Sequence, residues 1–317
     1  MPIQTELGKA YEYACLNAIY TYLSINQGIS IDQTRALTIA RDYYNGSIQV
    51  VKMNMDLAAN AAIRVILRLE PQLENPFSNI PLYLTIQEDA TGISGDVRDV
   101  LCIRRQNQWE IGLSCKHNHT AVKHSRLSPT IDFGYSWFGI SCSRNYFNQI
   151  NPMFDLLKKM RENKLLWRDI LGKEEQFYVP LLDAFVLELN TLDKLNPGII
   201  PTRLLQYLLG SNDFYKIISL DNRSITQVQA FNLYGTLNRP AGNVQPQTRI
   251  PTLQMPTRFY DISYKMDSKN TIIITCDNGW SISMRIHNAS SRVEPSLKFD
   301  VTLVGVPPTL YIHHEPW

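Results

Sequence analysis

The sequence lacks any long run of apolar residues. No stretch approaches the roughly 18 consecutive apolar residues that a membrane-spanning helix needs. The beginning, MPIQTELGKAYEYACL, also lacks the apolar segment of a secretory signal peptide. We therefore expect a cytoplasmic protein that makes no contact with a membrane.

Cysteine is scarce, and neither sign of charge is in clear excess. The five cysteines are odd in number, and their spacing fits no zinc site and no disulfide framework. We expect reduced thiols, most of them buried as small apolar side chains. The formal net charge of +2 excludes a chain that is strongly basic throughout. Binding of nucleic acid would therefore require the basic residues to gather on one face.

The length bounds the domain organisation. The 317 residues suffice for one large domain or for two smaller ones. We expect residues 1–238 to form a core with an amino-terminal helical layer. Residues 239–257 contain four prolines, which indicates a linker or a long surface loop. Residues 258–317 predict a β-rich carboxy-terminal region.

The first third of the chain predicts helices. From Leu7 to Leu23, apolar residues recur at three- and four-residue spacing, which is the stripe of an amphipathic helix. Residues 32–44 and 55–69 predict two further helices, and Pro71 ends the second. Later in the chain, residues 146–163 and 179–195 also predict helices.

Strand signals lie in two regions. Residues 81–87, 100–105 and 109–116 predict three strands, and the short polar link RQNQ makes the last two a hairpin. Five more predicted strands follow residue 256, with a hairpin turn at residues 277–279. Together these elements predict a mixed α/β (α+β) fold, with a mixed sheet flanked by helices and a β-rich carboxy-terminal part.

Two charged residues stand at the ends of the predicted hairpin. Asp99 directly precedes the apolar run VLCI, and Lys116 ends the returning strand WEIGLSCK. Antiparallel pairing brings these ends together, and side-chain alternation places Lys116 opposite the apolar face. A carboxylate can hold Mg²⁺, while a lysine orients a water or stabilises charge during phosphodiester hydrolysis. By spacing alone, the pair is a weak signal, and a surface salt bridge on a hairpin is the favoured interpretation.

One carboxylate holds Mg²⁺ poorly, so a second acid is expected. Ser114 stands two residues before the lysine, where nucleases of this kind carry an acid. Glu110 lies on the same face of the strand, Glu12 lies on the first predicted helix, and Asp96 is close to Asp99 in sequence. The metal-ligand candidates are therefore Asp99 with Glu12 or Glu110, and Asp96 remains a third choice.

The stretch around this pair resembles a known family. GDVRDVLCIR followed by WEIGLSCKHNHTAVKHSRLS resembles the HaeIII family of type II restriction endonucleases. The segments ELGKAYEYACLNA and IDFGYSWFG agree as well, and so does the predicted helix at residues 178–188. The resemblance covers about residues 5–195, and it extends more loosely beyond.

The resemblance implies a restriction-endonuclease-like core of the PD-(D/E)XK type that cleaves double-stranded DNA with Mg²⁺. It implies the target GGCC, cut bluntly between G and C, and a cognate DNA methyltransferase as a genetic partner without direct contact. Asp99 is then the motif aspartate, Lys116 the motif lysine, and Ser114 the residue at the acid position. Because LGKAYE matches the Gly-Lys pattern of the first helix in many such nucleases, Glu12 is expected to supply the missing oxygen.

The segment after the predicted catalytic strand is rich in groups that can contact DNA. His117-Asn118-His119 spells HNH, but three adjacent residues cannot place a base and a metal ligand around one ion. We expect phosphate or base contacts instead. The candidates are His117, Asn118, His119, Lys123, His124, Arg126 and Arg144, and further arginines at 239, 249, 258 and 285 could read guanine. The aromatic residues Tyr135, Trp137 and Phe138 are expected to pack in the core.

A four-base-pair palindrome is most simply read by a two-fold dimer, so a homodimer is expected, although one subunit acting twice would also serve. The β-rich region 258–317 is a candidate for DNA recognition or dimerisation. Two other functions are compatible with the residues. One is a structure-specific nuclease on the same core, and the other is a catalytically inactive DNA-binding protein marked by Ser114.

Overall fold

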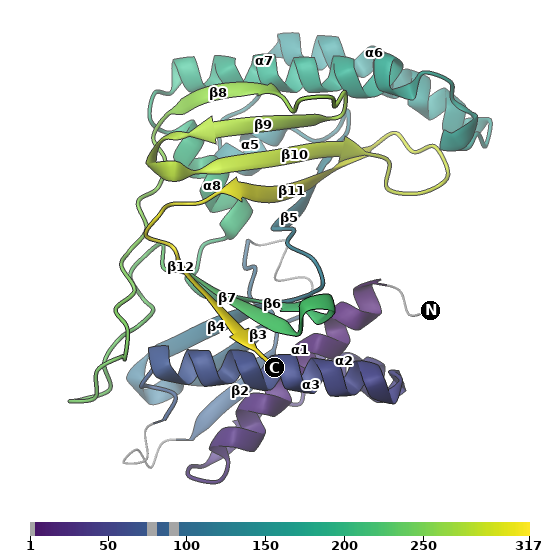
Figure 1. Cartoon of the computed structure of the whole chain (residues 1–317). Coiled ribbons are helices and arrows are strands. Elements are labelled where there is room, and N and C mark those ends of the chain that lie inside the picture. The colour runs from purple at the N-terminus through teal and green to yellow at the C-terminus, as the bar shows by residue number, and fades with distance from the viewer. Residues whose placement is uncertain (1–3, 75–80, 89–94) are drawn as a thin grey trace. The chain divides into compact units, whose positions relative to one another are not determined.

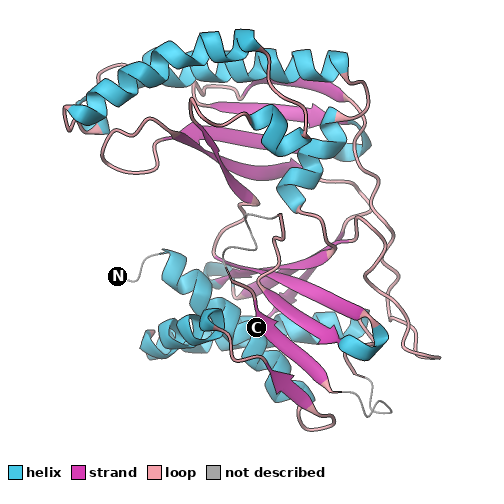
Figure 2. Ribbon diagram, turned by 180° about the vertical axis from the view of Figure 1, so that it is seen from behind, coloured by secondary structure: helices cyan, strands magenta, loops and turns pink. Residues whose placement is uncertain are grey.

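The structure is a computed structural model that describes residues 4–74, 81–88 and 95–317. The chain divides into two compact units, each built from separate segments (Figures 1 and 2). Unit 1 comprises Met1–Thr120, Gly210–Leu253 and Thr309–Trp317, and unit 2 comprises Ala121–Leu209 and Gln254–Pro308. No helix in the described part of the chain is long and apolar enough to span a membrane.

Unit 1 contains a mixed seven-stranded sheet. Its strand order is β1-β2-β3-β4-β6-β7-β12. The β1–β2 and β4–β6 pairs are parallel, and the other pairs are antiparallel. The strands are β1 (Ile29–Ile31), β2 (Leu82–Ile86), β3 (Val100–Arg104), β4 (Trp109–His117), β6 (Phe214–Leu220), β7 (Ile225–Phe231) and β12 (Tyr311–Pro316).

Three helices accompany this sheet, in purple and dark blue in Figure 1. α1 (Gln4–Leu23) packs on β2, β3 and β4, α2 (Arg35–Gly46) packs on α1, and α3 (Gln49–Leu69) packs on β6, β7 and β12. The predicted stripe of α1 is buried, because residues such as Tyr11 and Cys15 are inaccessible to solvent. Alanines on the buried face of α3 let the helix approach the sheet closely.

The predicted hairpin is confirmed as β3 and β4. The four apolar residues that alternate along β4, from Trp109 to Cys115, belong to the core beneath α1. Alternation then directs Ser114 and Lys116 to the other face of the sheet. The sequence pattern therefore predicted correctly which face of this strand carries polar chemistry.

Unit 2 contains an antiparallel five-stranded sheet of order β5-β11-β10-β9-β8. The strands are β5 (Lys123–Leu127), β8 (Phe259–Tyr264), β9 (Thr271–Cys276), β10 (Ser281–His287) and β11 (Leu297–Gly305). The helices are α5 (Phe133–Phe138), α6 (Arg144–Glu162), α7 (Val179–Leu195) and α8 (Ile200–Leu209). Aromatic rings fill its core, where Phe133 contacts Trp137 and Phe185.

Several sequence predictions require correction. The second helix begins at Arg35 and not at residue 32, because residues 29–31 join the sheet and Thr34 caps the helix through Leu37 N (3.1 Å). Tyr135 is 67% exposed, whereas Trp137 and Phe138 are buried as expected. β5 lies in the stretch that was expected to be a polar segment, and β6, β7 and α8 were not predicted.

Other predictions are confirmed. The mixed fold of helices around a mixed sheet is observed. All five cysteines are free thiols, and four of them are buried. The turn between β9 and β10 uses Asn278 and Gly279 at positive φ.

The two units follow a different division from the boundaries at residues 239 and 257, because residues 121–209 pack with 254–308 and β12 completes the sheet of unit 1. The role of residues 258–317 stays a prediction.

Candidate active site

Asp99 and Lys116 meet at one end of the β3–β4 hairpin in unit 1. The backbone nitrogen of Asp99 donates to Leu113 O (2.7 Å), which continues the ladder one residue beyond β3. Asp99 Oδ2 accepts from Cys115 N at 2.7 Å and from Lys116 Nζ at 3.2 Å. Both side chains keep about a fifth of their surface exposed, at 21% and 18%. The pair is therefore oriented by the hairpin and open to a ligand.

The Lys116 ammonium is stabilised in its charged form. Burial lowers the pKa of Lys116, but the charge and hydrogen bond of Asp99 raise it more, and Glu12 adds to the effect. The net result is a pKa above the usual range of lysine. Lys116 therefore carries a positive charge at neutral pH.

Glu12 of α1 belongs to the same group of charges. α1 is tied to the end of β4, because Gln4 Nε2 donates to His117 O (2.8 Å). Glu12 is only 6% exposed and accepts from Lys9 Nζ at 3.1 Å. Burial and the nearby charge of Asp99 raise the pKa of Glu12 to about 8, although Lys9 and Lys116 oppose the shift. Two carboxylates from distant segments thus lie within electrostatic range of each other in a buried site.

This donor set fits a hard divalent cation. A cation would relieve the repulsion between Glu12 and Asp99, and oxygen ligands are those that Mg²⁺ prefers. Within the described residues, His, Cys, Asp and Glu form no cluster of three or more that could hold a metal ion. Two carboxylates are nevertheless a common protein contribution to a Mg²⁺ site that is completed by waters and substrate phosphates.

A second lysine lies on the same face of the sheet and was missed by the sequence analysis. The parallel β4–β6 register pairs Ser114 with Lys216. Lys216 is 5% exposed, and its Nζ donates to Thr120 O at 2.7 Å. Burial, with a contribution from Lys116, lowers the pKa of Lys216 to about 7. A lysine inside the apolar run FYKIISL was a visible signal, but only a prediction of β6 as a strand would have revealed it.

Glu110 has a different environment from Glu12. Its side chain is 44% exposed and accepts from Arg98 Nη1 at 2.7 Å. Arg98 is buried, also binds Asp96 at 2.7 Å, and lies across Gly112. The structure thus places Glu110 and Asp96 in an ion-pair network, whereas Glu12 lies near Asp99. The roles of Glu110 and Ser114 stay predictions.

The expected DNA-contacting residues fall into two groups, and those of unit 1 are partly internal. His117 is buried at 3% exposure, with Nδ1 3.0 Å from Ser219 Oγ and Nε2 3.7 Å from Asp221. Burial lowers the pKa of His117, although Asp221 opposes the shift. Asn118 is exposed, but its side chain accepts from Asp221 N (3.0 Å). His119 is half-buried. The internal partners of His117 favour a structural role.

The other candidates belong to unit 2. Lys123 Nζ donates to Tyr207 O (2.9 Å) and lies 3.8 Å from the centre of the Tyr207 ring. His124 pairs with Asp300 in the β5–β11 ladder. Arg126 is exposed and donates to Ser296 Oγ (3.0 Å), and Arg144 is exposed at the start of α6. Arg126 and Arg144 are thus accessible to DNA, whereas Lys123 is engaged within the unit.

Comparison with known proteins identifies the family. The model of the HaeIII restriction endonuclease family matches residues 8–307. The type II restriction enzyme HaeIII of Haemophilus aegyptius is 44% identical over 311 residues, which cover 98% of this chain and 97% of the relative. No solved structure matches. The chain therefore belongs to the HaeIII restriction endonuclease family and is a type II site-specific deoxyribonuclease, a hydrolase that acts on double-stranded DNA.

Proposed function

We propose that Asp99, Glu12 and Lys116 form the catalytic centre, and that the enzyme uses Mg²⁺ to cut GGCC bluntly between G and C. The observation that carries the assignment is the convergence of these three residues. Asp99 Oδ2 accepts from Lys116 Nζ, and Asp99 raises the pKa of the buried Glu12 carboxyl. Type II restriction endonucleases generally use a divalent metal, and this pair of carboxylates would hold it.

The residues of the chain divide the work as follows. A bound Mg²⁺ would polarise a phosphoryl oxygen and lower the pKa of a water. The hydrogen bond from Cys115 N (2.7 Å) orients the Asp99 carboxylate through Oδ2, and the other oxygen, Oδ1, would bind the metal. Lys116 presents a charged ammonium that stabilises the negative charge accumulating on the phosphorus oxygens in the transition state. A preformed charge of this kind needs no reorganisation during the reaction.

Lys216 lies beside the serine that stands at the acid position. Ser114 is small and buried at 3% exposure, and Lys216 is its partner on the neighbouring strand. We assign Lys216 to the electrostatic environment of Lys116, because the charge of Lys116 contributes to the lowered pKa of Lys216. Where an acid would add negative charge, this site therefore carries an additional amine.

The family supports further parts of the proposal. A homodimer would present two such centres to the two strands of a palindrome. The enzyme would act in the cytoplasm beside a DNA methyltransferase that protects the same target, and the two proteins need not touch. The accessible arginines Arg126 and Arg144 remain candidates for DNA contact.

One digestion tests activity, target and cut position together. A plasmid of known sequence is incubated with the enzyme and Mg²⁺, and the fragment ends are sequenced. We expect blunt ends between G and C of GGCC, and no cleavage in EDTA. Ends at another sequence would refute the target alone. Intact DNA in both Mg²⁺ and Mn²⁺, with DNA still shifted in a gel, would support a binding protein without catalysis.

A further inference from the structure

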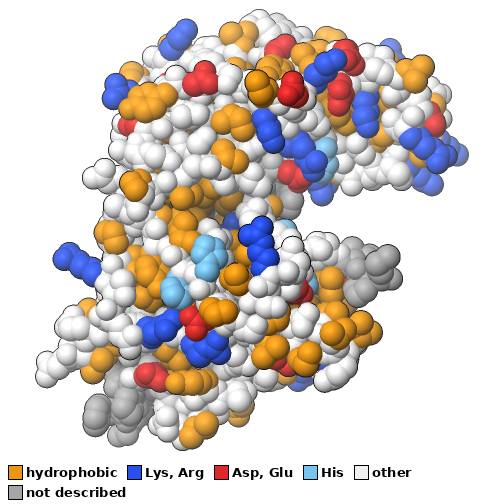
Figure 3. Space-filling model, in the orientation of Figure 1, with side chains coloured by type: hydrophobic (Ala, Val, Ile, Leu, Met, Phe, Trp, Pro, Cys, Tyr) orange, Lys and Arg blue, Asp and Glu red, His pale blue; other side chains and the backbone are white. Residues whose placement is uncertain are grey.

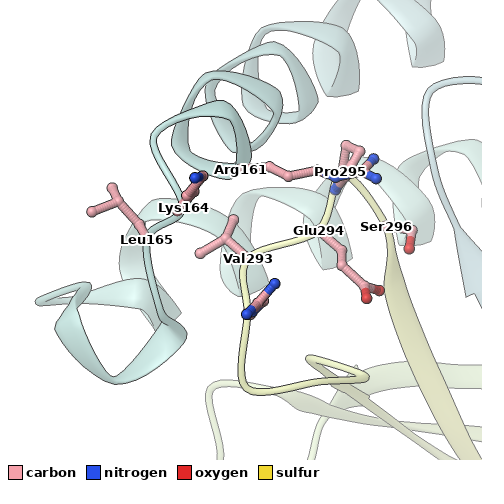
Figure 4. A pocket seen from close by; sticks show the side chains of 8 residues that line it. Arg161, Lys164, Leu165, Val293, Glu294, Pro295 and Ser296 are labelled. Carbon is pink, nitrogen blue, oxygen red and sulfur yellow. The ribbon is translucent and has the colours of Figure 1, made fainter.

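A basic hollow lies in unit 2, between the end of α6 and the loop that joins β10 to β11. Figure 4 shows Arg161 and Lys164 at the end of the helix, beside the loop that carries Val293, Glu294 and Pro295. Its volume is about 500 Å³, which is ample for a phosphodiester group. Figure 3 shows a group of Lys and Arg side chains at the right-hand end of this unit.

Backbone hydrogen bonds hold the two walls together. Val293 N donates to Leu165 O (3.1 Å), and Trp167 N donates to Ser291 O (3.0 Å). Val293, which lines the hollow, is buried at 1% exposure, and Trp167 is buried at 3%. Inside the loop, Ser290 Oγ donates to Arg292 O at 2.8 Å. These bonds therefore fix the backbones of the two walls relative to each other.

The charges of the lining are not balanced internally. Arg161, Lys164 and Arg292 are exposed, and their side chains make no hydrogen bond or ion pair within the part of the chain that the structure describes. The one acid of the lining, Glu294, lies 3.9 Å from Arg126 and 3.1 Å from Ser290 Oγ. Three basic side chains therefore line the hollow, and its acid, Glu294, is already paired with Arg126.

The attraction between cations and the carboxyl end of α6 explains only part of this cluster of basic residues. Cations near the carboxyl end of a helix stabilise it, which accounts for Arg161 in the last turn of α6. Arg292 comes from the opposite loop and has no such role. Lys164 stands at φ 57, a left-handed conformation after the end of α6 where glycine is favoured. Lys164 and Arg292 thus bring two cations from different segments to the lining of the same hollow.

We propose that this hollow binds the phosphodiester backbone of the DNA substrate. Arg161, Lys164 and Arg292 would donate to phosphate oxygens, and Arg126 at its edge would extend the basic surface. Such contacts position the duplex without reading bases, so they add affinity for any sequence. The proposal rests on duplex DNA as the substrate, and it is independent of the metal ligands and of the target sequence.

The test measures binding in EDTA, so that no cleavage occurs. Fluorescence anisotropy follows a labelled duplex of about 25 base pairs, with or without GGCC, as salt rises from about 50 to about 300 mM. The triple variant Arg161→Gln, Lys164→Gln, Arg292→Gln is compared with Lys173→Gln, Lys194→Gln, Lys265→Gln, which removes equal charge elsewhere in unit 2. We expect the hollow variant to reduce the slope of log K against log salt by about 2 to 3, equally on both duplexes.

The outcomes separate the proposal from its alternatives. Equal slopes for the wild type and both triple variants would overturn it, and so would a wild type that binds neither duplex. A loss confined to the GGCC duplex would mean base reading, which also contradicts the proposal. Arg292→Lys in an otherwise wild-type chain should keep the wild-type slope, because a phosphate contact needs charge and not a guanidinium plane. Failure to cleave GGCC in Mg²⁺ would leave these binding results unaffected.

Discussion

Asp99 Oδ2 lies 3.2 Å from Lys116 Nζ and 2.7 Å from the backbone nitrogen of Cys115. The strand that carries the lysine therefore also fixes the aspartate. This arrangement distinguishes the pair from a surface salt bridge, in which two long flexible side chains lose entropy to meet. Here the hairpin register brings the groups together, and both keep part of their surface accessible.

Removal of the Lys116 amine should abolish most of the catalysis and leave DNA binding intact. For Lys116→Met we expect a fall of about 10²–10³-fold in the single-turnover cleavage rate, because a preorganised charge next to the phosphoryl group is lost. Anisotropy in Ca²⁺ should show DNA binding within a few-fold of the wild type. Lys194→Met, at an exposed position of unit 2, is the matched control and should cut normally. A Lys116→Met enzyme with normal rates would remove Lys116 from the site.

The second metal ligand can be identified by two parallel substitutions. Glu12→Gln should lower Mg²⁺-dependent cleavage by at least about 100-fold, whereas Glu110→Gln should change it by only a few-fold. Because the raised pKa of Glu12 keeps much of its carboxyl protonated at neutral pH, the isosteric amide of Glu12→Gln should leave the stability close to that of the wild type. Cleavage rates over a Mg²⁺ titration, together with urea unfolding, make the comparison. The reverse order of the two effects would move the ligand role to Glu110.

Lys216 should contribute to the rate and not to folding. Lys216→Met keeps the buried stem and removes the amine, so we expect normal unfolding in urea and a loss of cleavage of about 10²-fold. The loss should lie in the maximal rate and not in the DNA concentration at half-maximal rate. An unchanged maximal rate would show that Lys216 only anchors Thr120 O.

Gly112 leaves the space that Arg98 occupies. A Cβ at this position would come within 2.1 Å of Arg98 Cδ and 2.7 Å of Arg98 Cβ. Since Arg98 is buried and held by Asp96 and Glu110, it cannot move aside freely. Gly112→Ala should therefore destabilise the protein by about 1–3 kcal/mol in urea unfolding. Gly46→Ala, where a Cβ meets no atom within 4 Å, is the control, and equal stability of the two variants would contradict the expected clash.

Glu70 should make the stability of unit 1 fall as pH rises from mildly acidic to neutral values. Burial raises its pKa to about 7, although Asn238 and Tyr215 donate to its Oε1. Its Oε2 is buried with no hydrogen-bond partner among the described residues, which fits a protonated acid. A raised pKa in the folded state gives stability that is present below about 4.5 and is lost as pH rises through about 7.

The corresponding measurement is urea unfolding at several pH values. The wild type should lose stability between pH about 5 and about 8, by an amount on the order of a few kcal/mol. Glu70→Gln should reduce this dependence, because the amide cannot ionise, and the remaining part should come from Glu12, whose pKa is also raised. Identical pH profiles for the wild type and Glu70→Gln would show that Glu70 does not titrate in this window.

Local patterns carried the sequence predictions that succeeded. Apolar alternation in residues 109–116 determined which side of β4 is buried, and the short link to β3 determined the hairpin register. These signals are local, because neighbouring residues and a four-residue link decide them. The start of α2 was misjudged, since the pairing of residues 29–31 with β2 depends on a strand far along the chain.

The sequence by itself determined the α1 stripe, the β3–β4 hairpin and hence the meeting of Asp99 with Lys116. Only the tertiary structure decided that Glu12 lies near Asp99, that Lys216 stands beside Ser114, and that Glu110 pairs with Arg98. The physical reason is the range of the interactions. Hairpins form between adjacent segments, whereas the packing of α1 on β4 and the parallel pairing of β4 with β6 join segments that only the complete fold brings together.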